Sequence, residues 1–274
     1  MTLRTALVTG ASSGLGRELV RQLVRDRGMT VLATARRLDR LEDLAAELPT
    51  GRVLIEAGDL ADDAFRARLW ARAESLPGGL DLLVNNAGLG HYAPFEDQDA
   101  AVRRQIIEIN IVALFDLTAK AVRSMRARGS GQILQVSSVL GFVGLPYSAD
   151  YVASKHAVNG LVKSLRYELR GSGVRVWAAC PGQFVSEFRQ SAMGGNEPGH
   201  DSKGEPVERV ARGIVRGLDR RSAFCFPTTS AMAIVESSRW LSWPFEWMMA
   251  RWAPGHFRKE LGVDRPESSR GPGT

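Results

Sequence analysis

The chain has 274 residues, of which 44% are apolar and 24% charged, a composition typical of a globular protein with a sizeable core. Two cysteines are too few for a disulfide framework or a cysteine metal site, and no apolar stretch reaches the ~20 residues of a membrane span. The formal charge of +6 comes from scattered arginines mixed with acids, which indicates solvated helix faces and argues against nucleic-acid binding. The first ten residues lead into a strand pattern without a signal-peptide core, so we expect a cytoplasmic protein.

Short apolar runs alternate along the chain with helical patterns. The runs are continuous, as in strands buried on both faces, and cover 6–8, 31–33, 53–55, 82–84, 133–136 and 174–179. Between them, apolar residues recur at three- and four-residue spacing, as at 15–23, 41–48, 106–117 and 161–169. This alternation predicts an α/β protein with a doubly wound parallel sheet and helices on both faces. A Gly- and Pro-rich stretch at 184–206 interrupts the pattern and is typical of a loop or lid.

Three glycines lie between the first strand and the first helix, in the stretch "TGASSGLG". Gly10, Gly14 and Gly16 would let a pyrophosphate approach the unpaired N–H groups of the helix N-terminus. A strand-to-helix turn without a ligand is the alternative. The strand–turn–helix setting favours the phosphate site.

Tyr151 and Lys155, in "YVASK", are four residues apart and share one face of a predicted helix. A free phenol has a pKa of about 10, too high for efficient proton transfer at neutral pH. We expect the ammonium of Lys155 to stabilise the phenolate and lower the pKa of Tyr151. In isolation, such a pair would equally fit an ordinary helix face.

Five motifs in the same order carry a family resemblance. They are the glycine turn, "NNAG" at 85–88, "VSS" at 136–138, "YVASK" at 151–155 and "PGQFVS" at 181–186. Together they resemble the short-chain dehydrogenase/reductase family, in its non-extended, hydroxysteroid- and retinol-dehydrogenase-like branch. The resemblance implies a Rossmann-like fold and hydride transfer between a nicotinamide cofactor and a carbonyl or alcohol.

The resemblance also implies a role for each catalytic residue. Tyr151 would be the general acid in reduction and the base in oxidation, and Ser138 would hydrogen-bond the substrate oxygen. Lys155 would also hold the nicotinamide ribose. Asn110, in "EINIVALF", would carry a proton relay through water to the lysine. A capping or interface amide remains the alternative for Asn110.

The predicted cofactor contacts follow from the same motifs, with Asp59 beside the adenine. They are Gly10, Ser12, Ser13, Gly14, Leu15, Gly16, Arg36, Arg37, Asp59, Leu60, Asn86, Ala87, Gly88, Tyr151, Lys155, Pro181, Gly182, Val185 and Ser186. At the end of the second strand, Ala35 stands where an acid would bind the ribose of NAD, and Arg36 and Arg37 follow. Since a guanidinium can bind a 2′-phosphate with two hydrogen bonds, we expect NADP(H) as the cofactor. We expect no metal.

The substrate is predicted to be a lipophilic carbonyl compound or alcohol. The lining residues would be Leu140, Phe142, Leu145, Phe184, Phe188 and Met193, with Tyr147 near the substrate entrance. Two other functions stay open. A sugar-nucleotide epimerase or dehydratase would have different glycine spacing, and a dinucleotide-sensing regulatory protein usually lacks the Tyr–Lys pair.

The last part of the chain is aromatic, with four of the six tryptophans between positions 240 and 252. We divide the chain into a catalytic domain at 1–226, a helical extension at 227–262 and a disordered tail at 263–274. We expect the extension to pack on the domain beside the substrate entrance or a subunit interface. An interfacial membrane helix is the alternative, favoured by Arg239, Arg251, Arg258 and Lys259. The resemblance also suggests a homodimer or homotetramer formed through the helices that carry Asn110 and Tyr151.

Overall fold

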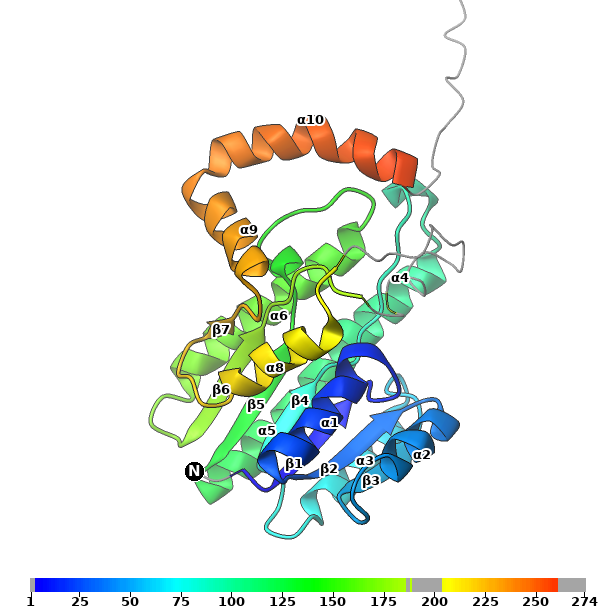
Figure 1. The fold of residues 1–274 in the computed structure, drawn as a ribbon, viewed down its shortest axis with the longest axis vertical. Coiled ribbons are helices and arrows are strands. Elements are labelled where there is room, and N and C mark those ends of the chain that lie inside the picture. The colour runs from blue at the N-terminus through cyan, green and yellow to red at the C-terminus, as the bar shows by residue number, and fades with distance from the viewer. Residues whose placement is uncertain (1–2, 186–187, 189–203, 261–274) are drawn as a thin grey trace, which may run out of the picture.

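The computed structural model describes residues 3–185, 188 and 204–260, and it contains one parallel sheet (Figure 1). The strands are β1 (Thr5–Thr9), β2 (Thr30–Ala35), β3 (Val53–Ala57), β4 (Leu82–Asn85), β5 (Gly131–Val136), β6 (Val174–Ala179) and β7 (Phe224–Cys225). Their order is β3-β2-β1-β4-β5-β6-β7. The predicted doubly wound parallel sheet is confirmed. Only β7 was not predicted, because its two residues are too short for a recognisable apolar run.

Helices cover both faces of the sheet because successive strand residues point to opposite sides. On one face, Ala6 and Val8 of β1 pack in a cluster with α1 (Gly14–Arg27), α2 (Leu38–Ala46) and α8 (Val207–Gly217). On the other face, Leu7 packs with α3 (Asp63–Glu74), α5 (Leu114–Arg128) and α6 (Ala149–Glu168). Both clusters are buried, as the continuous apolar runs predicted, but β3 at the edge of the sheet is only half-buried.

The helix predicted across 106–117 is interrupted by a π-helical turn. It begins as α4 (Ala100–Ile107), passes through a π-helical turn at Glu108–Ala113, labelled η2, and continues as α5. A π turn holds one residue more than the regular helix, and such turns often occur at functional sites. Here the turn contains Asn110, which is 1% exposed.

Buried hydrogen bonds fix α5 against the sheet. The Asn85 side chain at the end of β4 donates to Thr118 Oγ1 (3.0 Å) and to Gln135 Oε1 (3.1 Å). It also lies 3.4 Å from the carbonyl of Leu114, the first residue of α5. These bonds satisfy polar groups that are shielded from water, so they set the distance between α5 and the carboxyl ends of β4 and β5.

The C-terminal segment forms α9 (Thr229–Trp240) and α10 (Ser242–Glu260), at the end of the molecule opposite the N-terminus (Figure 1). Ala231 and Val235 of α9 pack on Val139, in a short helical turn at Val139–Gly141, labelled η3. The tryptophans that follow are exposed among the residues that the structure describes, so α9 packs on the domain while much of the aromatic surface of the extension stays uncovered there.

Candidate active site

The glycine turn leaves the N-terminus of α1 open. Ser13 precedes the helix without capping it through its side chain, so the first N–H groups of α1 keep no side-chain partner there. Gly10 (φ 67°) and Gly14 (φ 50°) adopt left-handed conformations that disfavour other residues. A Cβ at Gly16 would collide with the Gly10 carbonyl and the Asn86 amide. The turn is thus shaped as a cradle for an anionic group at a helix N-terminus.

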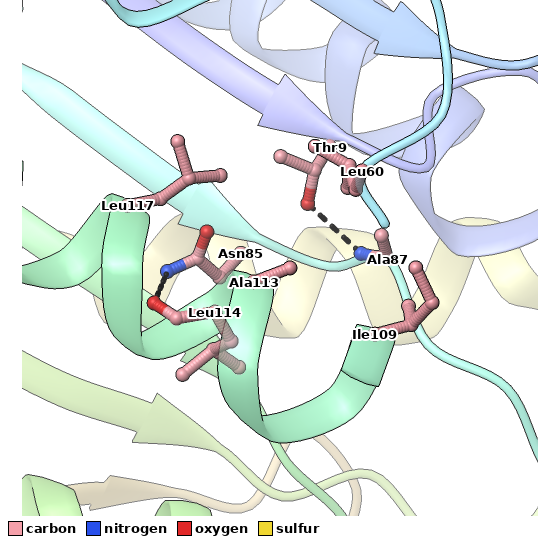
Figure 2. Close-up of a pocket in the computed structure, with 8 residues that line it drawn as sticks. All are labelled: Thr9, Leu60, Asn85, Ala87, Ile109, Ala113, Leu114 and Leu117. Carbon is pink, nitrogen blue, oxygen red and sulfur yellow. Dashed lines mark hydrogen bonds between the residues drawn. The ribbon is translucent and has the colours of Figure 1, made fainter. Parts of the chain in front are cut away.

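The motif after β4 is bonded directly to this turn. Thr9 Oγ1 accepts from the backbone N–H groups of Asn86 (3.0 Å) and Ala87 (2.9 Å), the latter drawn in Figure 2. In return, Asn86 Nδ2 donates to the carbonyls of Thr9 (2.9 Å) and Gly10 (3.3 Å). Figure 2 shows a small, largely apolar cavity beneath this junction, where Ile109 and Ala113 of the π turn face Ala87.

The predicted adenine side of the site lies around β2 and β3. The Arg37 guanidinium donates to Ser12 Oγ from Nε (3.3 Å) and Nη2 (3.2 Å), which brings it to the glycine turn. Arg36 is exposed beside it. Asp59 Oδ1 accepts a hydrogen bond from the backbone N–H of Ala61 (2.9 Å). The carboxylate of Asp59 therefore stabilises the turn in which it lies. The next carbonyl, of Leu60, accepts from the buried Arg66, which sequence reasoning did not single out.

Tyr151 and Ser138 come together at the carboxyl end of β5. Ser138 Oγ accepts from the Leu140 N–H (3.1 Å), which orients the serine. Burial raises the pKa of Tyr151, the nearby Tyr92 raises it further, and a hydrogen bond with Ser138 opposes both. The expected lowering of this pKa is therefore wrong for this structure, because desolvation of the phenolate is the largest cause of the shift and disfavours the charged form. Tyr92 was missed because only the fold brings the loop after β4 to Tyr151.

Lys155 lies beneath the tyrosine and is 4% exposed. Its Nζ donates to the carbonyl of Val136 (2.9 Å) and lies 5.4 Å from the Tyr151 ring centroid. Burial lowers the pKa of Lys155 to about 8, and Cys180 opposes this shift. A Cβ at Gly88 would stand 3.7 Å from Nζ, so this glycine leaves space directly beside the ammonium.

Asn110 links the π turn to the loop that follows the NNAG motif. Its Oδ1 accepts from the Leu89 N–H (2.7 Å), and its Nδ2 donates to the Leu89 carbonyl (2.8 Å) and to Ser154 Oγ (3.0 Å). Ser154 lies between Tyr151 and Lys155 on α6. The side chain therefore positions the loop and α6, while its relay role stays a prediction.

The predicted substrate-lining residues that the structure describes lie on several parts of the fold. Phe188 lies beside Tyr151, with ring centroids 5.5 Å apart. Phe184 packs on the α1–α8 side of the sheet, and Leu140 packs beside Val139 and α9. Tyr147 is half-buried with a left-handed φ of 62°, and its carbonyl accepts from Ala93 (2.9 Å).

The remaining predicted contacts lie at the end of β6 and in the loop after it. The carbonyl of Pro181 accepts from Val139 (3.0 Å), Gly182 adjoins Ala231 of α9, and Val185 bonds the carbonyl of Glu205 (3.2 Å). Leu145 is half-buried. Ser186, Met193 and most of the predicted lid lie outside the described residues.

The parallel sheet, the open helix N-terminus and the Ser–Tyr–Lys arrangement together place the chain among the Rossmann-like α/β proteins. The model of the family described as short chain dehydrogenase matches residues 4–196. The chain belongs to the short-chain dehydrogenase/reductase family and is an oxidoreductase of that family. Among the described residues, no group of His, Cys, Asp or Glu is placed to hold a metal, and no helix could cross a bilayer.

Three known proteins illustrate the similarity. An uncharacterized oxidoreductase from Myxococcus xanthus is 39% identical over 226 residues, covering 79% of this chain and 86% of that protein. A D-beta-hydroxybutyrate dehydrogenase from Rhizobium meliloti is 34% identical, covering 67% and 72%. The structure of a short-chain dehydrogenase from Sphingobium yanoikuyae in complex with NADPH aligns with a TM-score of 0.76 at 27% identity, covering 98% and 99%.

The glycine cradle yields a first prediction. Gly16→Ala should lower the free energy of unfolding by roughly 2–4 kcal/mol, because the new methyl group displaces Asn86 from its two carbonyl partners. Chemical denaturation measures this. Gly160→Ala is the matched control, since a Cβ at that exposed position in α6 meets nothing within 4 Å. Equal stability of the two variants would contradict the close approach at Gly16.

Proposed function

We propose that this chain is an NADP(H)-dependent oxidoreductase that interconverts a lipophilic ketone or aldehyde and its alcohol, with Tyr151 as general acid and base. The observation that carries the proposal is the group formed by Ser138, Tyr151 and buried Lys155 at the carboxyl ends of β4 and β5. This group adjoins the loop of Gly88, which is bonded through Asn86 to the glycine turn. Cofactor and proton donor would therefore meet at one edge of the sheet.

The residues present fit a phosphorylated dinucleotide. The turn at Gly10, Gly14 and Gly16 leaves room for a pyrophosphate at the uncapped N-terminus of α1. Arg36 and Arg37 would hold the 2′-phosphate, and Ala35 leaves no carboxylate to repel it. When bound, the nicotinamide supplies or accepts the hydride.

Each catalytic residue has a role that its geometry supports. The raised pKa of Tyr151 keeps its phenol protonated at neutral pH, so a proton is present for the alkoxide that hydride transfer forms, which is a stronger base than the phenolate. Ser138 hydrogen-bonds the same oxygen and stabilises its developing charge. The ammonium of Lys155 compensates the charge left on Tyr151 after proton transfer and binds the ribose hydroxyls beside Gly88.

The lipophilic substrate class is supported by the surroundings of the tyrosine. The ring of Phe188 contacts that of Tyr151, and Leu140 and Phe142 belong to the apolar cluster after Ser138. An apolar wall with a small number of convergent polar groups is the usual composition of a small-molecule site. It would bind an apolar carbonyl compound better than a small charged oxo acid.

A substrate panel tests the function. We expect NADPH-dependent reduction of apolar aldehydes, ketones, steroids or quinones at a higher kcat/KM than reduction of acetoacetate. Tyr151→Phe should lower kcat by about a hundredfold to ten-thousandfold with little change in NADPH affinity, because the phenol donates the proton but does not hold the phosphates. Tyr167→Phe, at an exposed position on α6, is the control. Normal kcat in Tyr151→Phe would overturn the assignment.

The lowered pKa of Lys155 leads to a prediction for the pH dependence of reduction. Below its pKa of about 8, Lys155 carries its charge, and Tyr151 is protonated throughout this range. The kcat/KM for reduction should thus be level up to about pH 8 and fall above it. Lys155→Arg should be slower but should lack this decline, since a guanidinium stays charged. A wild-type kcat/KM that rises from pH 7 to 9 would contradict the proposed protonation states.

The basic residues after β2 predict the cofactor preference. We expect kcat/KM to favour NADPH over NADH at least tenfold, since a charge-assisted contact contributes about 1.5–3 kcal/mol. Arg36→Ala and Arg37→Ala should raise the KM for NADPH and barely change that for NADH. Ala35→Asp should invert the preference. Arg25→Ala, on the exposed side of α1, is the control. Equal use of both cofactors by the wild type, unchanged in both arginine variants, would exclude this site.

A further inference from the structure

The outer surface of the C-terminal helices is unusually apolar. Six large side chains of α9 and α10 and their junction form what we call the aromatic face: Trp240 (74% exposed), Leu241 (58%), Trp243 (76%), Trp247 (55%), Met248 (47%) and Trp252 (54%). Single exposed apolar residues are normal, but six large ones on two consecutive helices mark a surface that binds something. The other two tryptophans, Trp70 and Trp177, are buried.

The two sides of α10 explain why this face remains uncovered. Phe245, Met249 and Ala253 recur every four residues, and these positions are half-buried or buried. Trp243 and Trp247 repeat with the same spacing on another side of the helix, which is exposed. Since α10 already packs through one stripe, the aromatic face is free to contact something outside the chain.

Positive charge lies on the same surface. The Arg251 guanidinium stands over the Trp247 ring at 5.1 Å from its centroid, and that of Arg239 stands over Trp240 at 5.5 Å. Tryptophan rings and arginines occupy the same depth at a bilayer surface, where rings sit among headgroups and guanidinium groups meet phosphates. The net charge of +6 adds a general attraction to an anionic surface.

A second copy of the chain fits this face less well. In a two-fold interface the face would meet itself, and Arg239 and Arg251 of each copy would be brought into a partly desolvated, apolar contact. The nearby carboxylates are poorly placed to pair with these arginines across such an interface. Glu236 already accepts a hydrogen bond from Trp240 Nε1 (2.8 Å). Glu246 is next to Trp247 in the sequence and therefore lies about 100° around the helix from that ring.

We propose that the aromatic face docks the protein on an anionic lipid surface, as a peripheral contact with α10 lying in the plane of the headgroups. The tryptophans enter the interfacial layer, and Arg239 and Arg251 bind lipid phosphates. Because α9 packs on the turn after Ser138, the lipid lies near the carboxyl end of the sheet. This docking does not depend on the proposed reaction.

Vesicle binding by the full chain tests the proposal. The protein should float with vesicles of phosphatidylcholine and phosphatidylglycerol, and its tryptophan emission should shift to the blue and be quenched by brominated lipid. Trp243→Ser combined with Trp247→Ser should weaken binding at least about tenfold, since both rings lose their apolar contact with lipid. Arg251→Gln should weaken binding to the anionic vesicles about fivefold, and less to pure phosphatidylcholine.

The controls separate lipid docking from other causes. Tyr167→Ser removes a more exposed aromatic ring from α6 and should bind vesicles as the wild type does. The altered tryptophans are exposed, so the melting temperature should not change; should the double variant unfold, Trp243→Ser alone replaces it. Absence of vesicle binding, or binding unaffected by the tryptophan variants, overturns the proposal. A dimer that dissociates in the double variant, without vesicle binding by the wild type, would instead assign the face to a second copy.

Discussion

The candidate site depends on the hydrogen bonds that join the ends of β1 and β4. Thr9 accepts two backbone N–H groups from the NNAG motif, and Asn86 returns two bonds to the carbonyls of Thr9 and Gly10. These bonds give partners to polar groups at the point where the two strands end. They fix the glycine turn relative to Gly88, and Gly88 in turn adjoins Lys155 and Asn110. The phosphate cradle and the proposed proton donor thereby keep a constant separation.

Burial determines the chemistry at the other end of this arrangement. An isolated tyrosine next to a lysine becomes more acidic, but here both groups are removed from water, which disfavours the charged form of each. The resting pair is thus a neutral phenol above an ammonium whose charge is only moderately stable. Such a pair is poised to give up a proton when negative charge develops on a substrate oxygen, and to recover it when that charge is gone.

Sequence reasoning succeeded where a feature depends on neighbouring residues. The strands buried on both faces could be predicted from continuous apolar runs, and the glycine turn from three positions in eight residues. It did not identify Thr9, Tyr92 or Ser154, because their contacts arise from strand order and from loops that meet only in the fold. It also misjudged the pKa of Tyr151, since the extent of desolvation is a property of the whole packed structure.

Because of the π turn at Glu108–Ala113, the geometry of the site depends on the number of residues in this helix. Removing one residue there would restore regular winding and rotate α4 by about 100° relative to α5. Asn110 could then not keep its bonds to Leu89 while Leu117 and Met125 of α5 stay in the core. Substitutions at exposed positions of this segment leave these contacts in place, whereas a single-residue insertion or deletion breaks them. Among related chains, those that share the Asn110 contacts should accordingly also share the spacing from Gly88 to Leu117, whatever residues fill it.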